Sequence, residues 1–106
     1  MNDLTVKKAQ KMVADFVKNR GWDKQPFSID MMFMAEELGE VTKEALIMAV
    51  KRKEKKTKRE SIESLGEELA DLFYWVLKVS TRFNINLGKV FLKKMKKNEA
   101  RCLPKK

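Results

Sequence analysis

Histidine is absent from this chain of 106 residues, and cysteine occurs once, as Cys102. Nucleophilic catalysis by a serine–histidine or cysteine–histidine pair is therefore excluded. A single cysteine forms no internal disulfide, which favours a reducing compartment, so we expect a cytoplasmic protein. Without histidine, any acid–base chemistry falls to carboxylates, lysines or water.

Helix breakers and long apolar segments are scarce as well. The chain has two prolines and four glycines, and it lacks the run of about 20 apolar residues that spans a bilayer. Its first residues show no signal-peptide pattern. Apolar residues make up 43% of the chain, and Ala, Leu, Lys, Glu and Met dominate, a composition that favours helices. We therefore expect a single all-α domain over residues 1–106.

Signals for helix ends divide the chain into four segments. Gly21 follows the first segment as a helix-ending glycine, and Pro26 lies in the loop after it. Residues that can cap a helix N-terminus are Asp3, Ser28, Ser61 or Ser64, and Asn86. The sequence predicts a bundle of four helices, at residues 4–20, 29–52, 61–83 and 87–101.

Two acidic segments of the chain are near-copies. Ala35-Glu36-Glu37-Leu38-Gly39-Glu40-Val41 recurs 31 positions later as Gly66-Glu67-Glu68-Leu69-Ala70-Asp71-Leu72. Each copy has two carboxylates three residues apart, which a helix places close together beside an apolar stripe. The expected stripes are Met34, Leu38, Val41, Ala45 and Met48 in one helix and Leu65, Leu69, Leu72, Val76 and Val79 in the other.

Antiparallel packing of these helices would bring four carboxylates together, those of Glu37, Glu40, Glu68 and Asp71. Such a cluster repels itself unless a cation lies within it, and hard oxygen ligands suit Mg²⁺. On spacing alone, a solvated acidic surface explains these residues as well as a metal site does, although Glu68 and Asp71 lack a basic residue one helical turn away. Gly39 and Gly66, which are costly in a helix, would allow close approach of the two helices.

The net charge of +9 is unevenly distributed. Residues 51–59 carry seven bases and one acid, and residues 89–106 carry eight bases and one acid. The remainder of the chain carries nine bases and thirteen acids, so it is mildly acidic. Basic patches attract the phosphates of nucleic acids, membranes or nucleotides, and the alternative is a surface that only confers solubility.

The acidic segments resemble the signature of a known family. Glu36-Glu37-x-x-Glu40, then 27 residues, then Glu68-x-x-Asp71 is similar to the EExxE…ExxD pattern of MazG-type nucleotide pyrophosphohydrolases, which belong to the all-α NTP pyrophosphatases. Arg20-Gly21-Trp22-Asp23 and the run from Lys94 to Arg101 resemble further segments of single-domain members. The likeness covers about residues 18 to 104.

The resemblance implies hydrolysis of nucleoside triphosphates to the nucleoside monophosphate and pyrophosphate. The implied substrates are deoxynucleoside triphosphates or non-standard nucleoside triphosphates, and the implied role is housecleaning of the nucleotide pool. It implies metal ligands at Glu37, Glu40, Glu68 and Asp71 and catalytic residues at Glu36, Glu37 and Glu40. It implies Mg²⁺, for which Mn²⁺ could substitute. Glu36 would hold a second ion or orient the attacking water.

Substrate contacts are expected from the fourth helix and from two tryptophans. Lys94, Asn98 and Arg101 share one helix face, which by spacing alone reads more readily as a solvated helix end. The resemblance instead implies that this face binds phosphates and sugar. Trp75, on the acidic side of its helix, and Trp22 could stack on the base, although each is also a candidate core residue.

The third helix is apolar on nearly all sides, which one neighbouring helix cannot cover. We therefore expect a homo-oligomer, and the resemblance implies a dimer or tetramer whose sites are completed between subunits. A competing interpretation is a non-enzymatic basic helical module that binds nucleic acid, but two acidic pairs beside the core would repel a phosphate backbone. A third is a structural oligomer with a stabilising ion. We expect neither a nucleic-acid partner nor a membrane.

Overall fold

The computed structural model describes residues 3–50 and 56–101. Within these residues the chain forms helices and turns and no strand. The elements in order are α1 (Val6–Asn19), the short 3₁₀ helix η1 (Trp22–Lys24), α2 (Phe27–Val50), α3 (Lys58–Arg82) and α4 (Leu87–Arg101). The expectation of an all-α fold with four helices is confirmed.

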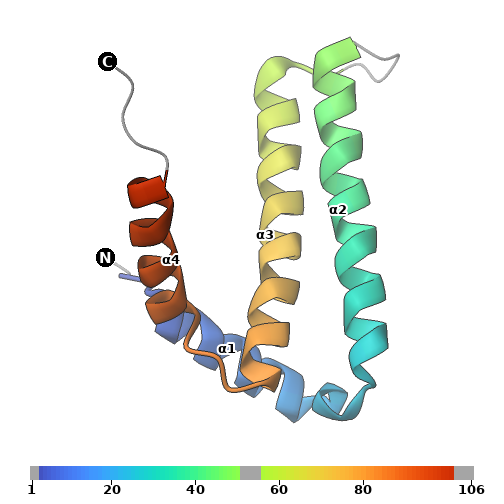
Figure 1. The fold of residues 1–106 in the computed structure, drawn as a ribbon. Helices are drawn as coiled ribbons and strands as arrows, with labels where there is room; N and C mark the ends of the chain where they lie inside the picture. Colours follow the sequence, from blue (N-terminus) through green and yellow to red (C-terminus); the bar gives the residue numbers. More distant parts are fainter. Residues whose placement is uncertain (1–2, 51–55, 102–106) are drawn as a thin grey trace.

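The two longest helices, α2 and α3, run antiparallel as a hairpin (Figure 1). At the end of the hairpin away from its loop, α1 packs across α3. The main contact of α4 is with α1, and α4 stands apart from the hairpin (Figure 1). No helix within residues 3–50 or 56–101 has the length and apolar character needed to cross a membrane.

The helix ends follow the sequence signals at some positions and depart from them at others. Gly21 has a φ of 72° just after α1 and donates its N–H to the carbonyl of Lys18, as a helix-ending glycine does. The Oδ1 atom of Asn86 accepts the N–H of Lys89 at 3.1 Å, which confirms Asn86 as the cap of α4. The cap of α1 is Thr5, whose hydroxyl accepts the N–H of Lys8, so the expectation of Asp3 was wrong.

The start of α3 lies three residues earlier than expected. Thr57 and Glu60 form a capping box, in which each side chain accepts the backbone N–H of the other residue, at 3.0 and 2.9 Å. Ser61 and Ser64 therefore lie inside α3. Likewise α2 begins at Phe27, so Ser28 lies inside that helix and does not cap it. The expected end of the second helix, at residue 52, lies outside the described residues.

The hydrophobic core of the described residues is small. Ala9, Val13 and Val17 of α1 pack on Leu77 of α3, and Val6, Tyr74 and Leu87 flank them. The accessible surface is 8793 Å², whereas a compact monomer of this mass would expose about 6,100 Å². Many large apolar side chains thus remain uncovered in the single chain.

The packing between α2 and α3 does not use the two expected apolar stripes throughout. Leu38 is 54% exposed and Leu69 is 48% exposed, so neither is buried in the contact between the two helices. An added Cβ atom at Gly39 or Gly66 would meet nothing within 4 Å, and close approach of helices within one chain does not require either glycine. Polar side chains occupy part of the seam instead.

Candidate active site

Three acidic residues of α2, at seven-residue intervals, lie in or beside its contact with α3. Asp30 is fully buried, Glu44 is 8% exposed, and Glu37 between them is half-buried. Residues seven apart share one face of a helix, two turns from each other. We call Asp30, Glu37 and Glu44 the acidic column.

The two ends of the acidic column are neutralised by cations of the same chain. At one end, Asp30 accepts hydrogen bonds from Lys78 Nζ at 2.8 Å and from Arg82 Nη1 at 3.0 Å. At the other end, Lys56 Nζ lies 3.2 Å from the Glu44 carboxylate. Burial of a carboxylate is tolerated when a cation and hydrogen bonds accompany it, and both ends meet that condition.

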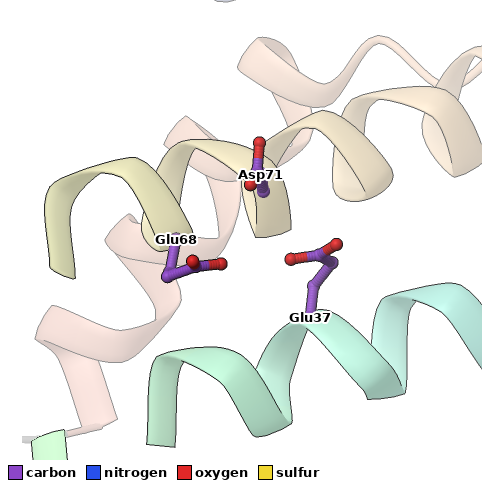
Figure 2. Close-up of side chains that lie close together, drawn as sticks. All are labelled: Glu37, Glu68 and Asp71. Carbon is purple, nitrogen blue, oxygen red and sulfur yellow. The ribbon is translucent and has the colours of Figure 1, made fainter. Parts of the chain in front are cut away.

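The centre of the acidic column lacks such a cation. One carboxylate oxygen from each of Glu37, Glu68 and Asp71 lies within 4.8 Å of the other two (Figure 2). Glu37 Oε1 is buried and has no hydrogen-bond partner among the described residues. None of the three carboxylates forms an ion pair within the described part of the chain. We call Glu37, Glu68 and Asp71 the carboxylate cluster.

Two of the three carboxyls in the carboxylate cluster, those of Glu37 and Glu68, have raised pKa values. Burial raises the pKa of Glu37, and the charges of Asp71, Glu68, Glu36 and Glu40 raise it further, in that order. Burial likewise raises the pKa of Glu68, followed by the charge of Asp71 and then of Glu40. An orphaned oxygen, three converging carboxylates and raised pKa values fit a hard divalent cation.

A cavity of about 550 Å³ opens beside the carboxylate cluster. Two of its lining residues, Glu37 and Asp71, belong to the cluster, and the others are apolar or aromatic. These others are Met12, Val13, Phe16, Trp22, Tyr74 and Trp75. An apolar compartment next to a candidate cation site can hold an aromatic ring attached to an anionic group.

The two tryptophans expected to contact a base both line this cavity. Trp75 stacks on Phe33, with ring centres 5.1 Å apart and an angle of 12° between the planes. Trp22 is 41% exposed and meets Phe16 edge to face at 5.8 Å. Phe33 thus covers part of Trp75, whereas Trp22 retains more open ring surface.

A family model of the MazG nucleotide pyrophosphohydrolase domain matches residues 25–104. The chain belongs to this family. The matched range includes the carboxylate cluster and α4, whereas Trp22 and the wall residues contributed by α1 precede it. Among curated proteins, the comparison finds no significant match to the chain. Because the MazG family typically depends on a divalent metal, the carboxylate cluster is the candidate metal centre of this domain.

Two further acids of the MazG signature lie outside the carboxylate cluster. Glu40, one turn beyond Glu37, is exposed and is not among the three converging carboxylates. Its charge nevertheless acts on both Glu37 and Glu68. Glu36 is exposed as well. The structure thus brings together three of the four expected ligands and leaves Glu40 close by.

The expected phosphate-binding face of α4 lies away from the carboxylate cluster within one chain. Lys94 and Arg101 are exposed, and Asn98 is half-buried. Arg101 Nη2 donates to Asn98 Oδ1 at 3.1 Å. None of these three side chains lines the cavity of its own chain.

Sequence reasoning missed the buried ion pairs and the part of the cavity wall that α1 supplies. The seven-residue spacing of Asp30, Glu37 and Glu44 was a signal for the former, because it places the three acids on one face. Met12 and Phe16 of α1 carry no comparable signal, since their spacing is that of any amphipathic helix.

Proposed function

We propose that this MazG domain hydrolyses nucleoside triphosphates to the nucleoside monophosphate and pyrophosphate. The proposed substrates are deoxynucleoside triphosphates or non-standard nucleoside triphosphates. Mg²⁺ is the proposed cofactor, with Mn²⁺ as a substitute, and the proposed role is housecleaning of the cytoplasmic nucleotide pool. One observation carries the proposal. Of the three acids in the column, only Glu37 lacks a cation among the described residues, and it faces two further carboxylates beside a cavity.

Glu37, Glu68 and Asp71 would hold the metal, with Glu40 next to them. The ion would supply positive charge that neutralises the triphosphate and polarises the attacked phosphorus. The aromatic wall of the cavity, including Trp22 and Trp75, would bind the base and exclude water from that side. These contacts would orient the triphosphate toward the carboxylates.

Glu36 would orient the attacking water or hold a second ion. It is exposed at the edge of the carboxylate cluster, and its charge raises the pKa of Glu37. Because the chain has no histidine, a carboxylate is the natural acceptor for the proton of the attacking water. Glu36, Glu37 and Glu40 are therefore the proposed catalytic residues.

We propose further that a second copy of the chain completes the site with Lys94, Asn98 and Arg101. Helical geometry puts these three side chains on the same side of α4 as the apolar residues Leu87 and Phe91. Phe91 is 58% exposed, and the single chain exposes far more surface than a compact monomer of its mass. A subunit that buries this side of α4 would also bury its three polar residues, next to the partner's site.

The proposed function is tested by incubating the protein with each canonical and common modified NTP, with and without Mg²⁺, and measuring pyrophosphate. We expect Mg²⁺-dependent release from at least one nucleotide. Glu37→Gln should reduce kcat by at least about a hundredfold, because it removes a charged ligand from the centre of the site. Glu63→Gln is the matched control, since Glu63 is exposed and, among the described residues, pairs only with Arg59.

Two outcomes would contradict the proposal. One is the absence of pyrophosphate with every nucleotide. The other is hydrolysis that Glu37→Gln leaves unchanged. Salt-dependent binding of DNA or RNA that survives Glu37→Gln, without hydrolysis, would instead favour a basic module that binds nucleic acid.

A further inference from the structure

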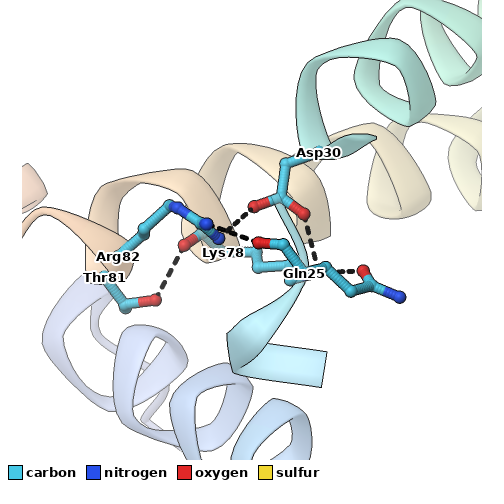
Figure 3. Close-up of polar contacts among 5 residues, drawn as sticks. All are labelled: Gln25, Asp30, Lys78, Thr81 and Arg82. Carbon is cyan, nitrogen blue, oxygen red and sulfur yellow. Dashed lines mark hydrogen bonds and ion pairs between the residues drawn. The ribbon is translucent and has the colours of Figure 1, made fainter. Parts of the chain in front are cut away.

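A buried polar cluster joins three segments of the chain at the end of the hairpin. Its centre is Asp30 in the first turn of α2, which is fully buried and binds Lys78 and Arg82 of α3 (Figure 3). Lys78 is 3% exposed. Both cations also reach the loop before α2, Lys78 to the side-chain oxygen of Gln25 at 3.0 Å and Arg82 to its carbonyl oxygen.

The polar cluster contacts one wall of the cavity directly. Lys78 Nζ lies 4.7 Å from the centre of the Trp75 ring, a distance at which an ammonium group is attracted to the indole. Trp75 lines the cavity together with Glu37 and Asp71. Lys78 is therefore one of the contacts of the Trp75 ring, together with Phe33, on which the ring stacks.

The polar cluster also reaches a second residue of the cavity wall, Trp22, through the loop. The backbone N–H of Gln25 donates to the carbonyl of Trp22 at 3.2 Å and closes η1. Lys78 and Arg82 fix Gln25 by two separate hydrogen bonds. Trp22, which also lines the cavity, is thus attached to the same anchor as Trp75.

We propose that Lys78, held by Asp30, is a positioning residue that holds Trp22 and Trp75 in place in the wall of the cavity. The inference rests on the proposed function, because it assigns the two rings to nucleotide binding. Lys78 lies two helical turns from Asp71, and its hydrogen bonds go to Gln25 and Asp30, none to the carboxylate cluster. Loss of its charge should therefore weaken substrate binding and leave the chemical step largely intact.

If Lys78 only stabilised the fold, Lys78→Met would lower stability without a selective rise in KM. Removal of one partner of a buried ion pair is costly when it leaves the other charge unpaired. In Lys78→Met, Asp30 keeps its bond to Arg82, which limits the cost to folding. The contact with Trp75 and the bond to the Gln25 side chain are both lost.

The experiment compares Lys78→Met, Lys78→Arg and Lys11→Met with the unaltered full chain. Lys11 is the matched control because it pairs with the exposed Asp15, and neither residue lines the cavity. We measure kcat and KM for the nucleotide that is hydrolysed best, and the near-ultraviolet circular dichroism of the two tryptophans. These are Trp22 and Trp75, the only two in the chain.

We expect Lys78→Met to raise KM by about five- to tenfold, with kcat changed by less than about twofold, and to alter the tryptophan dichroism. Lys78→Arg should restore much of the original KM and of the original tryptophan dichroism. Lys11→Met should change neither KM nor the dichroism. An unchanged KM, or a fall in kcat without a rise in KM, would overturn the proposal. If Lys78→Met does not fold, Gln25→Ala should raise KM by about two- to threefold, and no rise overturns the proposal.

Failure of the proposed function gives a distinguishable result. If the unaltered protein releases no pyrophosphate from any nucleotide, the hydrolase proposal falls. The tryptophan dichroism then decides the positioning role alone. A spectrum of folded Lys78→Met identical to that of the unaltered protein overturns it, and a changed spectrum that Lys78→Arg restores supports it.

Discussion

Glu37 carries the highest electrostatic cost among the acids of the column, because Asp30 and Glu44 have cationic partners and Glu37 faces carboxylates. A carboxyl whose pKa is raised in the folded state stabilises the fold below its ordinary pKa. This contribution is lost as the pH rises through the higher folded value. Without metal, the centre of the hairpin should therefore be least stable at neutral and higher pH.

Removing the charge of Glu37 should stabilise the metal-free protein. We expect Glu37→Gln, in the presence of a chelator, to raise Tm by a few degrees at pH 7, since it removes repulsion from Asp71 and Glu68. The gain should shrink near pH 4, where the carboxyl is protonated anyway. Thermal melts across this pH range measure both effects.

Two controls accompany these thermal melts, the variant Glu63→Gln and the addition of Mg²⁺. Glu63→Gln should not reproduce the gain, because Glu63 is exposed and beside Arg59. Mg²⁺ should raise Tm of the unaltered protein more than that of Glu37→Gln. A lower Tm of Glu37→Gln than of the unaltered protein at pH 7 without metal would contradict the electrostatic account.

Tyr74, the single tyrosine of the chain, reports on the cavity wall. Burial and the charge of Asp30 raise its pKa, whereas Arg20 lowers it. The neutral phenol therefore stabilises the fold, and this contribution is lost as the pH rises through the folded pKa. In a spectrophotometric alkaline titration, we expect Tyr74 to ionise above the ordinary value for tyrosine.

Removing the positive charge of Arg20 should raise the pKa of Tyr74 further. Arg20→Ala should raise the Tyr74 midpoint, whereas Arg59→Ala, which removes an exposed cation paired with Glu63, should not change it. A midpoint in the native protein equal to that of the unfolded chain would be inconsistent with burial of the phenol.

At the scale of elements, the number and order of helices followed from the sequence, and α4 has the expected bounds. The start of α3 did not follow, because Ser64-x-x-Glu67 fits the capping-box pattern as well as Thr57-x-x-Glu60 does, and the structure forms the box at Thr57. The two expected apolar stripes are only partly covered, because Leu38 and Leu69 are exposed, whereas Asp30 and Glu44 are buried.

The candidate site was predictable from the sequence in part. The pairing of two acidic segments identified Glu37, Glu68 and Asp71, because helical spacing is independent of the partner. The pairing of Asp30 with Lys78, 48 residues later, depends on the register of α2 against α3. Tertiary packing sets that register, and a single sequence does not reveal it.

The capping box of α3 gives a prediction at this scale. Thr57→Ala should lower the free energy of unfolding by about 1 kcal/mol, because it leaves the N–H of Glu60 without its acceptor. Denaturant titration measures the change. Thr42→Ala is the control, since Thr42 lies within α2 and bonds back to the carbonyl of Leu38, so its loss should cost little. Equal costs for both variants would show that the box contributes nothing beyond the loss of a hydroxyl.

At the scale of the whole molecule, the small core and the exposed apolar side of α4 predict self-association. We expect a native mass that is a multiple of 12.4 kDa in light scattering. Phe91→Glu should reduce that mass, because it places a charge in the apolar surface of α4. If the partner's α4 completes the site, activity should fall together with the mass.

Lys93→Glu is the matched control for this experiment, because Lys93 lies on the opposite side of α4 from Phe91. It should leave the mass unchanged. A protein that hydrolyses nucleotides at 12.4 kDa, with Phe91→Glu as active as the original, would contradict the proposed oligomer.

The acidic column also determines where the hairpin opens. Helices ordinarily fray from their ends, but here opposite charges close both ends of the α2–α3 contact and like charges meet at its midpoint. In hydrogen exchange without metal, amides near Glu37 and Asp71 should therefore exchange faster than those near Asp30 and Lys78. A bound divalent ion would reverse that order, so the protection pattern along the hairpin would itself report metal occupancy.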